Sequence, residues 1–164
     1  MAHPRTTLVP ALVALLIGAS ALAQEARIDL GDLRADPKMP VEVTADSFAV
    51  DQATSAAVFS GAVRISQGEM VITAASVTIE YAADGKGIRR LLATGGVILR
   101  AGMNEARAES ADYDIGSGEV TLTGDVVLTQ GSATISGQRM VVNLADGTGR
   151  IEGGVTTTFV PGSN

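Results

Sequence analysis

The chain has 164 residues, of which 46% are hydrophobic and 3% aromatic, and its formal net charge is −6. This acidic balance argues against nucleic acid or another polyanion as a partner. The chain contains no cysteine, which excludes disulfides and lipid attachment at a cysteine.

The first 23 residues have the pattern of a secretory signal peptide. Arg5 supplies a positive start, an apolar run extends from Leu8 to Ile17, and Ala21-Leu22-Ala23 forms an A-x-A cleavage site. We therefore expect export, with cleavage before Gln24. A retained membrane anchor is the alternative, but the run is shorter than the ~20 residues that span a bilayer.

Residues 24–40 show no periodicity and include Pro37 and Pro40, which is typical of an exposed N-terminal arm. The arm is expected either to contact a partner or to be a disordered leader. The single histidine, His3, leaves with the signal peptide. The exported chain then has neither His nor Cys, so we expect no metal, no cofactor and no catalytic residue.

Two short patterns recur through the rest of the chain. Ser/Thr-Gly-x-Val-x-Ile/Leu-x-x-Gly stands at 60–68, 94–102 and 123–131, with a truncated copy that starts at Ile151. A second unit starts at Val43, Ile72, Ala106 and Ile135. The two patterns alternate with a period of 29 residues, and one copy carries a five-residue insertion at the turn Asp84–Gly87. Such periods indicate stacked supersecondary units that share a core.

Each period holds two strands joined by short glycine-containing turns, so neighbouring strands are expected to be antiparallel, in a meander of about eight. The apolar alternation shifts by one residue in every second strand, which predicts stacked bends at Asp46, Ala75, Glu109 and Gln138. The predicted fold is all-β: an antiparallel twisted jelly-roll, or U-shaped two-sheet meander of 29-residue repeats, over residues 41–160, with a tail at 161–164.

The motifs at Pro40–Asp46, Val58–Val63, Gln67-Gly68 and Ile72–Ala74 resemble the OstA-like family of lipopolysaccharide-transport proteins, over roughly residues 40–160. The resemblance implies a periplasmic β-jellyroll with an apolar groove that carries lipopolysaccharide between membranes. It also implies jellyroll partners at the inner membrane (LptC-like) and the outer membrane (LptD-like), and subunits that stack head to tail. Unpaired terminal strands, including Val155–Val160, independently predict head-to-tail homo-oligomers.

Apolar side chains on the inward face are the candidate lipid contacts. An aliphatic lining suits acyl chains better than sugar rings. The residues alone favour a closed, dry core, whereas the resemblance favours an open groove. The predicted lipid-binding residues are Phe48, Phe59, Val63, Ile65, Ile72, Val77, Ile79, Leu91, Val97, Leu99, Tyr113, Val126, Leu128, Met140, Val142 and Phe159.

Polar candidates have two interpretations each. Asp46 and Glu109 could form an acid pair for glycoside cleavage, but their recurrence at the predicted bends favours a corner role. The leading hypothesis is a non-enzymatic lipopolysaccharide carrier, and the alternative is an exported structural or carbohydrate-binding β-repeat protein. Four arginines could meet lipid phosphates or form solvated surface: Arg64, Arg89, Arg90 and Arg100.

Overall fold

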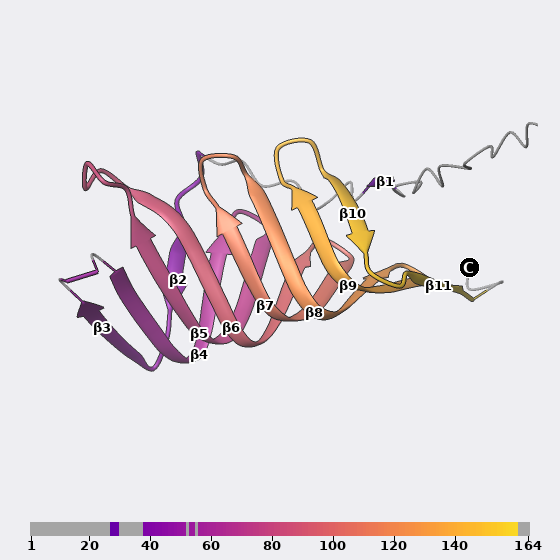
Figure 1. Ribbon diagram of the computed structural model, residues 1–164, viewed down its shortest axis with the longest axis horizontal. Helices are drawn as coiled ribbons and strands as arrows, with labels where there is room; N and C mark the ends of the chain where they lie inside the picture. Colours follow the sequence, from indigo (N-terminus) through magenta and orange to yellow (C-terminus); the bar gives the residue numbers. More distant parts are fainter. Residues whose placement is uncertain (1–26, 30–37, 52, 55, 161–164) are drawn as a thin grey trace, which may run out of the picture.

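The computed structural model describes residues 27–29, 38–51, 53–54 and 56–160 (Figure 1). The predicted signal peptide, its cleavage site and the tail at 161–164 lie outside the described residues. The described part of the chain forms eleven strands that belong to one antiparallel sheet. Across these ranges, we find no helix with the length and apolarity that a membrane span requires.

Six long strands make up most of the sheet: β4 (Ala56–Gln67), β5 (Met70–Tyr81), β6 (Ile88–Ala101), β7 (Asn104–Asp114), β8 (Glu119–Gln130) and β9 (Ala133–Asn143). The shorter strands are β1 (Arg27–Asp29), β2 (Glu42–Thr44), β3 (Ser47–Asp51), β10 (Thr148–Glu152) and β11 (Thr156–Phe159). This arrangement confirms the predicted all-β antiparallel fold. The first and last strands of the predicted meander are each interrupted at a bend, so they occur as β2 with β3 and as β10 with β11.

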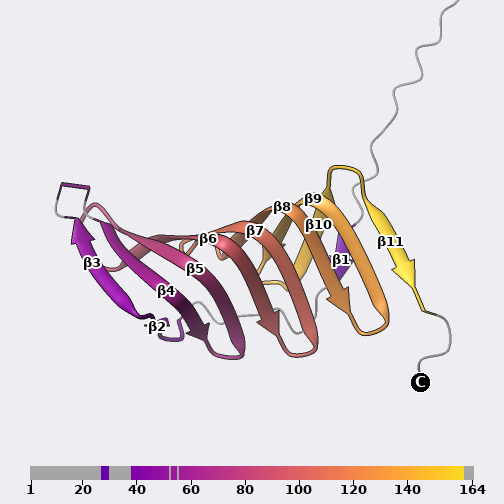
Figure 2. The ribbon, with the colours of Figure 1, turned by 90° about the horizontal axis from the view of Figure 1, so that it is seen from below.

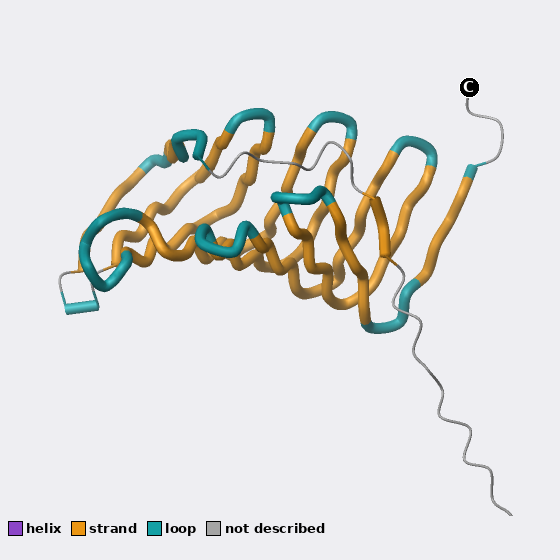
Figure 3. The backbone as a smooth tube through the Cα atoms, turned by 90° about the horizontal axis from the view of Figure 1, so that it is seen from above, coloured by secondary structure: helices purple, strands orange, loops and turns teal. Residues whose placement is uncertain are grey.

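Consecutive strands are neighbours from β4 to β10, β2 and β3 both pair with β4, and β10 and β11 both pair with β9. The pairing register shifts midway along every pair of long strands, for example between Ser60 and Val63 and between Thr123 and Val126. The shifts divide each long strand into two halves. The single sheet therefore folds over into two walls, whose connecting turns lie in two rows in Figure 3, and the strands slant along them in Figure 2.

Strand pairing defines the two walls. The first wall contains β3, the N-terminal halves of β4, β6 and β8, the C-terminal halves of β5, β7 and β9, then β10 and β1. The second wall contains β2, the remaining halves of β4 to β9, and β11. Both walls thus extend from the N-terminal edge (β2 and β3) to the C-terminal edge (β10 and β11).

The bends are made by glycines that pack against the residues predicted to mark them. At each bend a glycine has a φ between +81° and +86°, a conformation that L residues with a Cβ rarely adopt. A Cβ added at these glycines would lie only 2.4 to 2.7 Å from the facing side chain, so a larger residue cannot replace them without movement. The facing pairs are Gly61 with Asp46, Gly95 with Ala75, Gly124 with Glu109 and Gly153 with Gln138.

One strand lies where none was expected. β1 belongs to the predicted arm at 24–40, yet it pairs with β10, and the partly buried Ile28 packs against the core. Three residues are too few to show a period, and their partner is more than a hundred positions away, so the sequence pattern carries no sign of this strand. It adds an element to the first wall at the C-terminal edge.

Candidate functional site

The space between the walls is filled by apolar side chains from both, and most of the predicted lipid-binding residues lie there. Each of these residues is at most 3% exposed, and all belong to one hydrophobic cluster. These are Val63, Ile65, Ile72, Val77, Ile79, Leu91, Val97, Leu99, Tyr113, Val126, Leu128, Met140 and Val142. Their position on the inner face is as expected, while lipid contact stays a prediction.

Three predicted aromatic residues differ from this set. Phe59 is only partly buried against the cluster, whereas Phe48 is 56% and Phe159 is 68% exposed. Phe48 and Phe159 lie opposite the inward positions Phe59 and Ala133, so they share the inner face but are not enclosed, and their contact with lipid stays a prediction. Both lie on terminal strands, where no further strand of the described part of the chain covers them. Phe48 packs on one side only, against Phe59, with ring centroids 4.8 Å apart.

The interior is a packed core. Leu99, Val126 and Leu128 have no exposed surface, and their counterparts on the first wall, such as Leu122 and Met140, have none either. The two walls are in contact, in place of the open groove that the family resemblance favoured. Acyl chains can enter this space only if the walls separate. The facing side chains would then lose their contacts with each other and gain contacts with lipid.

A buried polar contact crosses the interior. The hydroxyl of Tyr113, in the first wall, donates to Oε1 of Gln67, in the second wall, at 2.9 Å. Gln67 in turn donates from Nε2 to the carbonyl oxygen of Met39 at 3.1 Å. Both side chains lie near the turns, away from the bends, and burial raises the pKa of the Tyr113 hydroxyl. This contact therefore holds the free rims of the walls together.

Sequence reasoning named Tyr113 but missed Gln67. Gln67 continues the inward alternation of Val63 and Ile65, and it is 1% exposed. That alternation was the signal that could have found it. Asn104 is a second buried amide, 5% exposed, and it begins β7 on the same rim of the second wall.

The four candidate phosphate-binding arginines do not converge. Arg89 forms an ion pair with Glu80, and Arg90 with Asp112, on the outer surface of the first wall. Arg100 is bonded to Glu105 at 2.6 Å on the second wall, and Arg64 is exposed there. Hydrogen bonds from Arg107 and Arg100 hold the pKa of Glu105 below its usual range. Arg89, Arg90 and Arg100 thus serve cross-strand pairs, and the four arginines do not form one anion site.

The acid pair considered for glycoside cleavage is excluded by the strand order. Asp46 joins β2 to β3 and Glu109 is on β7, so four inter-strand spacings separate them, or about 19 Å. Glycosidases place their two carboxyls roughly 5 to 9.5 Å apart. Each residue instead packs over a glycine at its own bend. Among the described residues, no group of acidic, His or Cys side chains could hold a metal ion.

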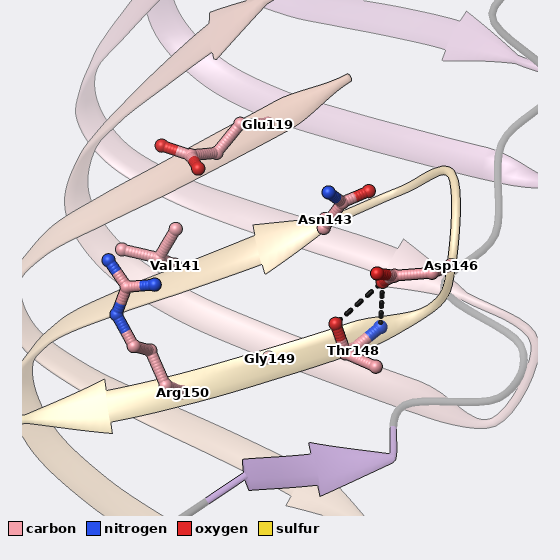
Figure 4. A pocket seen from close by; sticks show the side chains of 7 residues that line it. All are labelled: Glu119, Val141, Asn143, Asp146, Thr148, Gly149 and Arg150. Carbon is pink, nitrogen blue, oxygen red and sulfur yellow. Dashed lines mark hydrogen bonds between the residues drawn. The ribbon is translucent and has the colours of Figure 1, made fainter. Parts of the chain in front are cut away.

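A polar hollow of about 380 Å³ lies on the outer face of the first wall, across β8, β9 and β10 (Figure 4). Asp146 accepts hydrogen bonds there from the backbone N–H of Thr148, at 2.9 Å, and from its hydroxyl, at 2.6 Å. These bonds close the β9–β10 turn, so this part of the hollow has a structural role. The lining residues are Glu119, Val141, Asn143, Asp146, Thr148, Gly149 and Arg150.

Comparison with known proteins gives consistent results. Residues 42–148 match the family described as LptA/(LptD N-terminal domain) LPS transport protein. The chain is 26% identical over 152 residues to an uncharacterized protein of Rhizobium meliloti, with 88% of this chain and 82% of that protein covered. It is also 26% identical over 142 residues to the lipopolysaccharide export system protein LptA of Haemophilus influenzae, with 79% and 81% covered.

A solved structure has the same fold. It is LptH, described as the LptA homologous periplasmic component of the conserved lipopolysaccharide transport device from Pseudomonas aeruginosa. The TM-score is 0.68 at 19% identity, and the match covers 77% of this chain and 99% of that one. This likeness bears on the fold, and the family match agrees with the resemblance seen in the motifs.

Proposed function

Because the chain belongs to the LptA/LptD N-terminal domain family of lipopolysaccharide transport proteins, we propose that it is a periplasmic lipopolysaccharide carrier. It shields acyl chains between its two walls and bridges transport components of the inner and outer membranes. One observation carries this proposal. The apolar interior is continuous from the N-terminal edge to the C-terminal edge, and exposed aromatic side chains, Phe48 and Phe159, stand at its two ends.

The energetics of lipid transfer require such an interior. Each methylene group left in water costs about 0.8 kcal/mol, so an acyl chain of ten methylenes needs shielding worth roughly 8 kcal/mol. The inward residues of both walls are almost all aliphatic and can pack against hydrocarbon. Because they fill the interior, lipid enters as the rims part, and the bond between Tyr113 and Gln67 breaks as they do.

The two edges of the sheet support the bridging role. Every residue of β3 is exposed at the N-terminal edge, and every residue of β11 is exposed at the C-terminal edge. Such edges accept a strand from another molecule. We propose head-to-tail contacts with further copies of this chain, and with jellyroll domains of the LptC and LptD type at the two membranes. The interiors of successive molecules would then form one path.

A photo-crosslinking experiment tests lipid binding with a matched control. Val126 and Val127 are adjacent residues of the same type, and Val126 is fully buried on the inner face while Val127 faces outward. A photo-reactive amino acid at Val126 should capture lipopolysaccharide in cells, and one at Val127 should not. Leu99 and Ile98 give a second pair. Absence of lipid at both inward positions, with normal export and folding, would overturn the proposal.

A further inference from the structure

The C-terminal edge is open along only one of its two strands. β11 has no neighbour on its outer side among the described residues, whereas β10 is covered there by β1 of the same chain. β1 runs antiparallel to β10, with Arg27 opposite Arg150, Ile28 opposite Gly149 and Asp29 opposite Thr148. The first wall is thus closed at this edge by the chain's own N-terminal segment.

The meander itself shows where a second copy would pair. In the repeat, β10 is equivalent to the first half of β4, because each of them ends at an equivalent bend glycine, Gly153 and Gly61. On its far side, that half of β4 pairs with β5, so that Ile79 lies opposite Ala57. Strand β3 is the counterpart of this part of β5. A second copy that continues the meander therefore places its Val50 opposite Gly149 and its Asp51 opposite Thr148.

β1 lies in this same register and direction. Ile28-Asp29 stands opposite Gly149 and Thr148, where Val50-Asp51 of a second copy would stand. Both dipeptides consist of a β-branched apolar residue followed by aspartate. Ile28 is partly buried against the core, whereas Val50 is 60% exposed in a single chain. The segment at 27–29 thus imitates the strand that would extend the sheet.

We propose that the outer edge of β10 is a strand-binding site for β3 of a second copy, and that β1 competes for it from within the same chain. This inference rests on the head-to-tail assembly proposed above. β1 caps the first wall in the single molecule, and it must leave before the first walls of two molecules can join.

The two competitors differ in length. Among the described residues, β1 pairs with three residues of β10, and Ile151, Glu152 and all of β11 have no outer neighbour there. A second copy offers the five residues of β3 as well as β2, and it buries Phe48 and Val50. The tethered β1 has the advantage of a high effective concentration. β1 therefore prevails in dilute protein, and the second copy prevails as the concentration rises.

Two cysteine pairs that share Thr148 separate the two states. The chain has no cysteine of its own, and cross-strand partners are close enough for a disulfide. Asp29→Cys with Thr148→Cys should form an intramolecular disulfide that locks β1 in place. Asp51→Cys with Thr148→Cys should give covalent chains of subunits, since these two residues lie at opposite edges of one molecule.

Sedimentation of the full, export-processed chain provides the readout. The oxidised Asp29→Cys/Thr148→Cys protein should need about ten times the concentration of its reduced form to self-associate. Comparing two redox states of one protein controls for folding. Ile28→Asp, which removes the inward contact of β1, should shift association to lower concentration and raise the yield of the Asp51–Thr148 disulfide. Equal association of oxidised and reduced protein would overturn the competition.

The outcome is separable from that of the proposed function. If no variant associates at any concentration while Val126 still captures lipid, the carrier proposal stands, and the competition is overturned together with homo-assembly. If Val126 captures no lipid but association depends on β1 as described, the carrier proposal fails and the strand competition stands.

Discussion

The hydroxyl of Tyr113 and the side-chain amide of Gln67 join the two walls of the sheet across its interior, at 2.9 Å. Both side chains are 1% exposed, and Gln67 also fixes the backbone of Met39, which precedes β2. The bends join the walls along one side by covalent chain, whereas this contact joins their free rims. It therefore opposes separation of the walls at their free rims.

Replacement of Tyr113 by Phe should destabilise the fold. The change removes the hydrogen bond that Gln67 Oε1 accepts from this hydroxyl in the buried interior, at a cost of about 1 kcal/mol in the free energy of unfolding. Urea unfolding measures it. Tyr81→Phe is the control, because Tyr81 is 41% exposed on β5, two strands away in the same wall, and should change stability by less than about 0.5 kcal/mol. Equal effects of the two substitutions would contradict a closing role for this contact.

Because the Tyr113 hydroxyl is buried, we expect the free energy of unfolding to fall at alkaline pH. Burial raises the pKa of Tyr113 above its ordinary value of 10.0, so the neutral form is favoured more strongly in the folded chain. The contribution of the neutral hydroxyl to the free energy of unfolding is fully present below the ordinary pKa of tyrosine. It is lost as the pH rises through the raised pKa of Tyr113. Urea midpoints of the wild type should fall toward those of Tyr113→Phe as the pH rises above about 10. Parallel curves for the two proteins would refute this assignment.

The fold could be predicted because its signals are local. Alternation with a period of two identifies inward residues such as Val63 and Leu128, and the one-residue phase shift marks the bends, since each depends only on neighbours in the chain. The short motifs around Gly61 and Gly68 indicate the same family that the match over residues 42–148 shows. The glycine that faces each predicted bend residue explains why the same spacing recurs.

The remaining features depend on contacts between distant parts of the chain. The closed interior results from how closely the two walls approach, which alternation within a strand does not report. Arg90 pairs with Asp112 across 22 positions, so a possible phosphate ligand became part of an ion pair. Phe48 has the pattern of a core residue, but its burial requires a neighbouring strand that the described residues do not supply.

The close approach of a glycine and its facing residue at each bend can be tested by a destabilising substitution and a second substitution that relieves it. A Cβ at Gly95 would lie 2.6 Å from the Cβ of Ala75, and the residue has a φ of +83°. Gly96 has a similar φ of +84°, but a Cβ there would meet nothing within 4 Å. Gly95→Ala should therefore cost about 2–4 kcal/mol in unfolding free energy, and Gly96→Ala about 1–2 kcal/mol, the strain alone.

Ala75→Gly identifies the clash. In the Gly95→Ala background it removes the Cβ that the new methyl group would meet, so the double variant should be more stable than the sum of the single changes implies, by at least about 1 kcal/mol. Chemical denaturation of the four proteins in this cycle measures the coupling. Simple additivity would mean that the bend does not depend on this close approach.

Phe159 should matter for assembly and little for the stability of a single molecule. It is 68% exposed on β11, opposite Ala133, with one side of its strand unpaired in the described structure. In a second copy that continues the meander, β2 lies along β11 and Val41 comes opposite Phe159. Phe159→Ser should leave the urea midpoint equal to that of the wild type within experimental error. It should weaken self-association about tenfold, because the apolar contact between the two copies is lost. Sedimentation over a concentration series measures this, and Met103→Ser, at an 82% exposed turn residue away from both edges, is the control. If Phe159→Ser and Met103→Ser both associate as the wild type does, β11 is not part of the interface between copies, and that interface lies elsewhere.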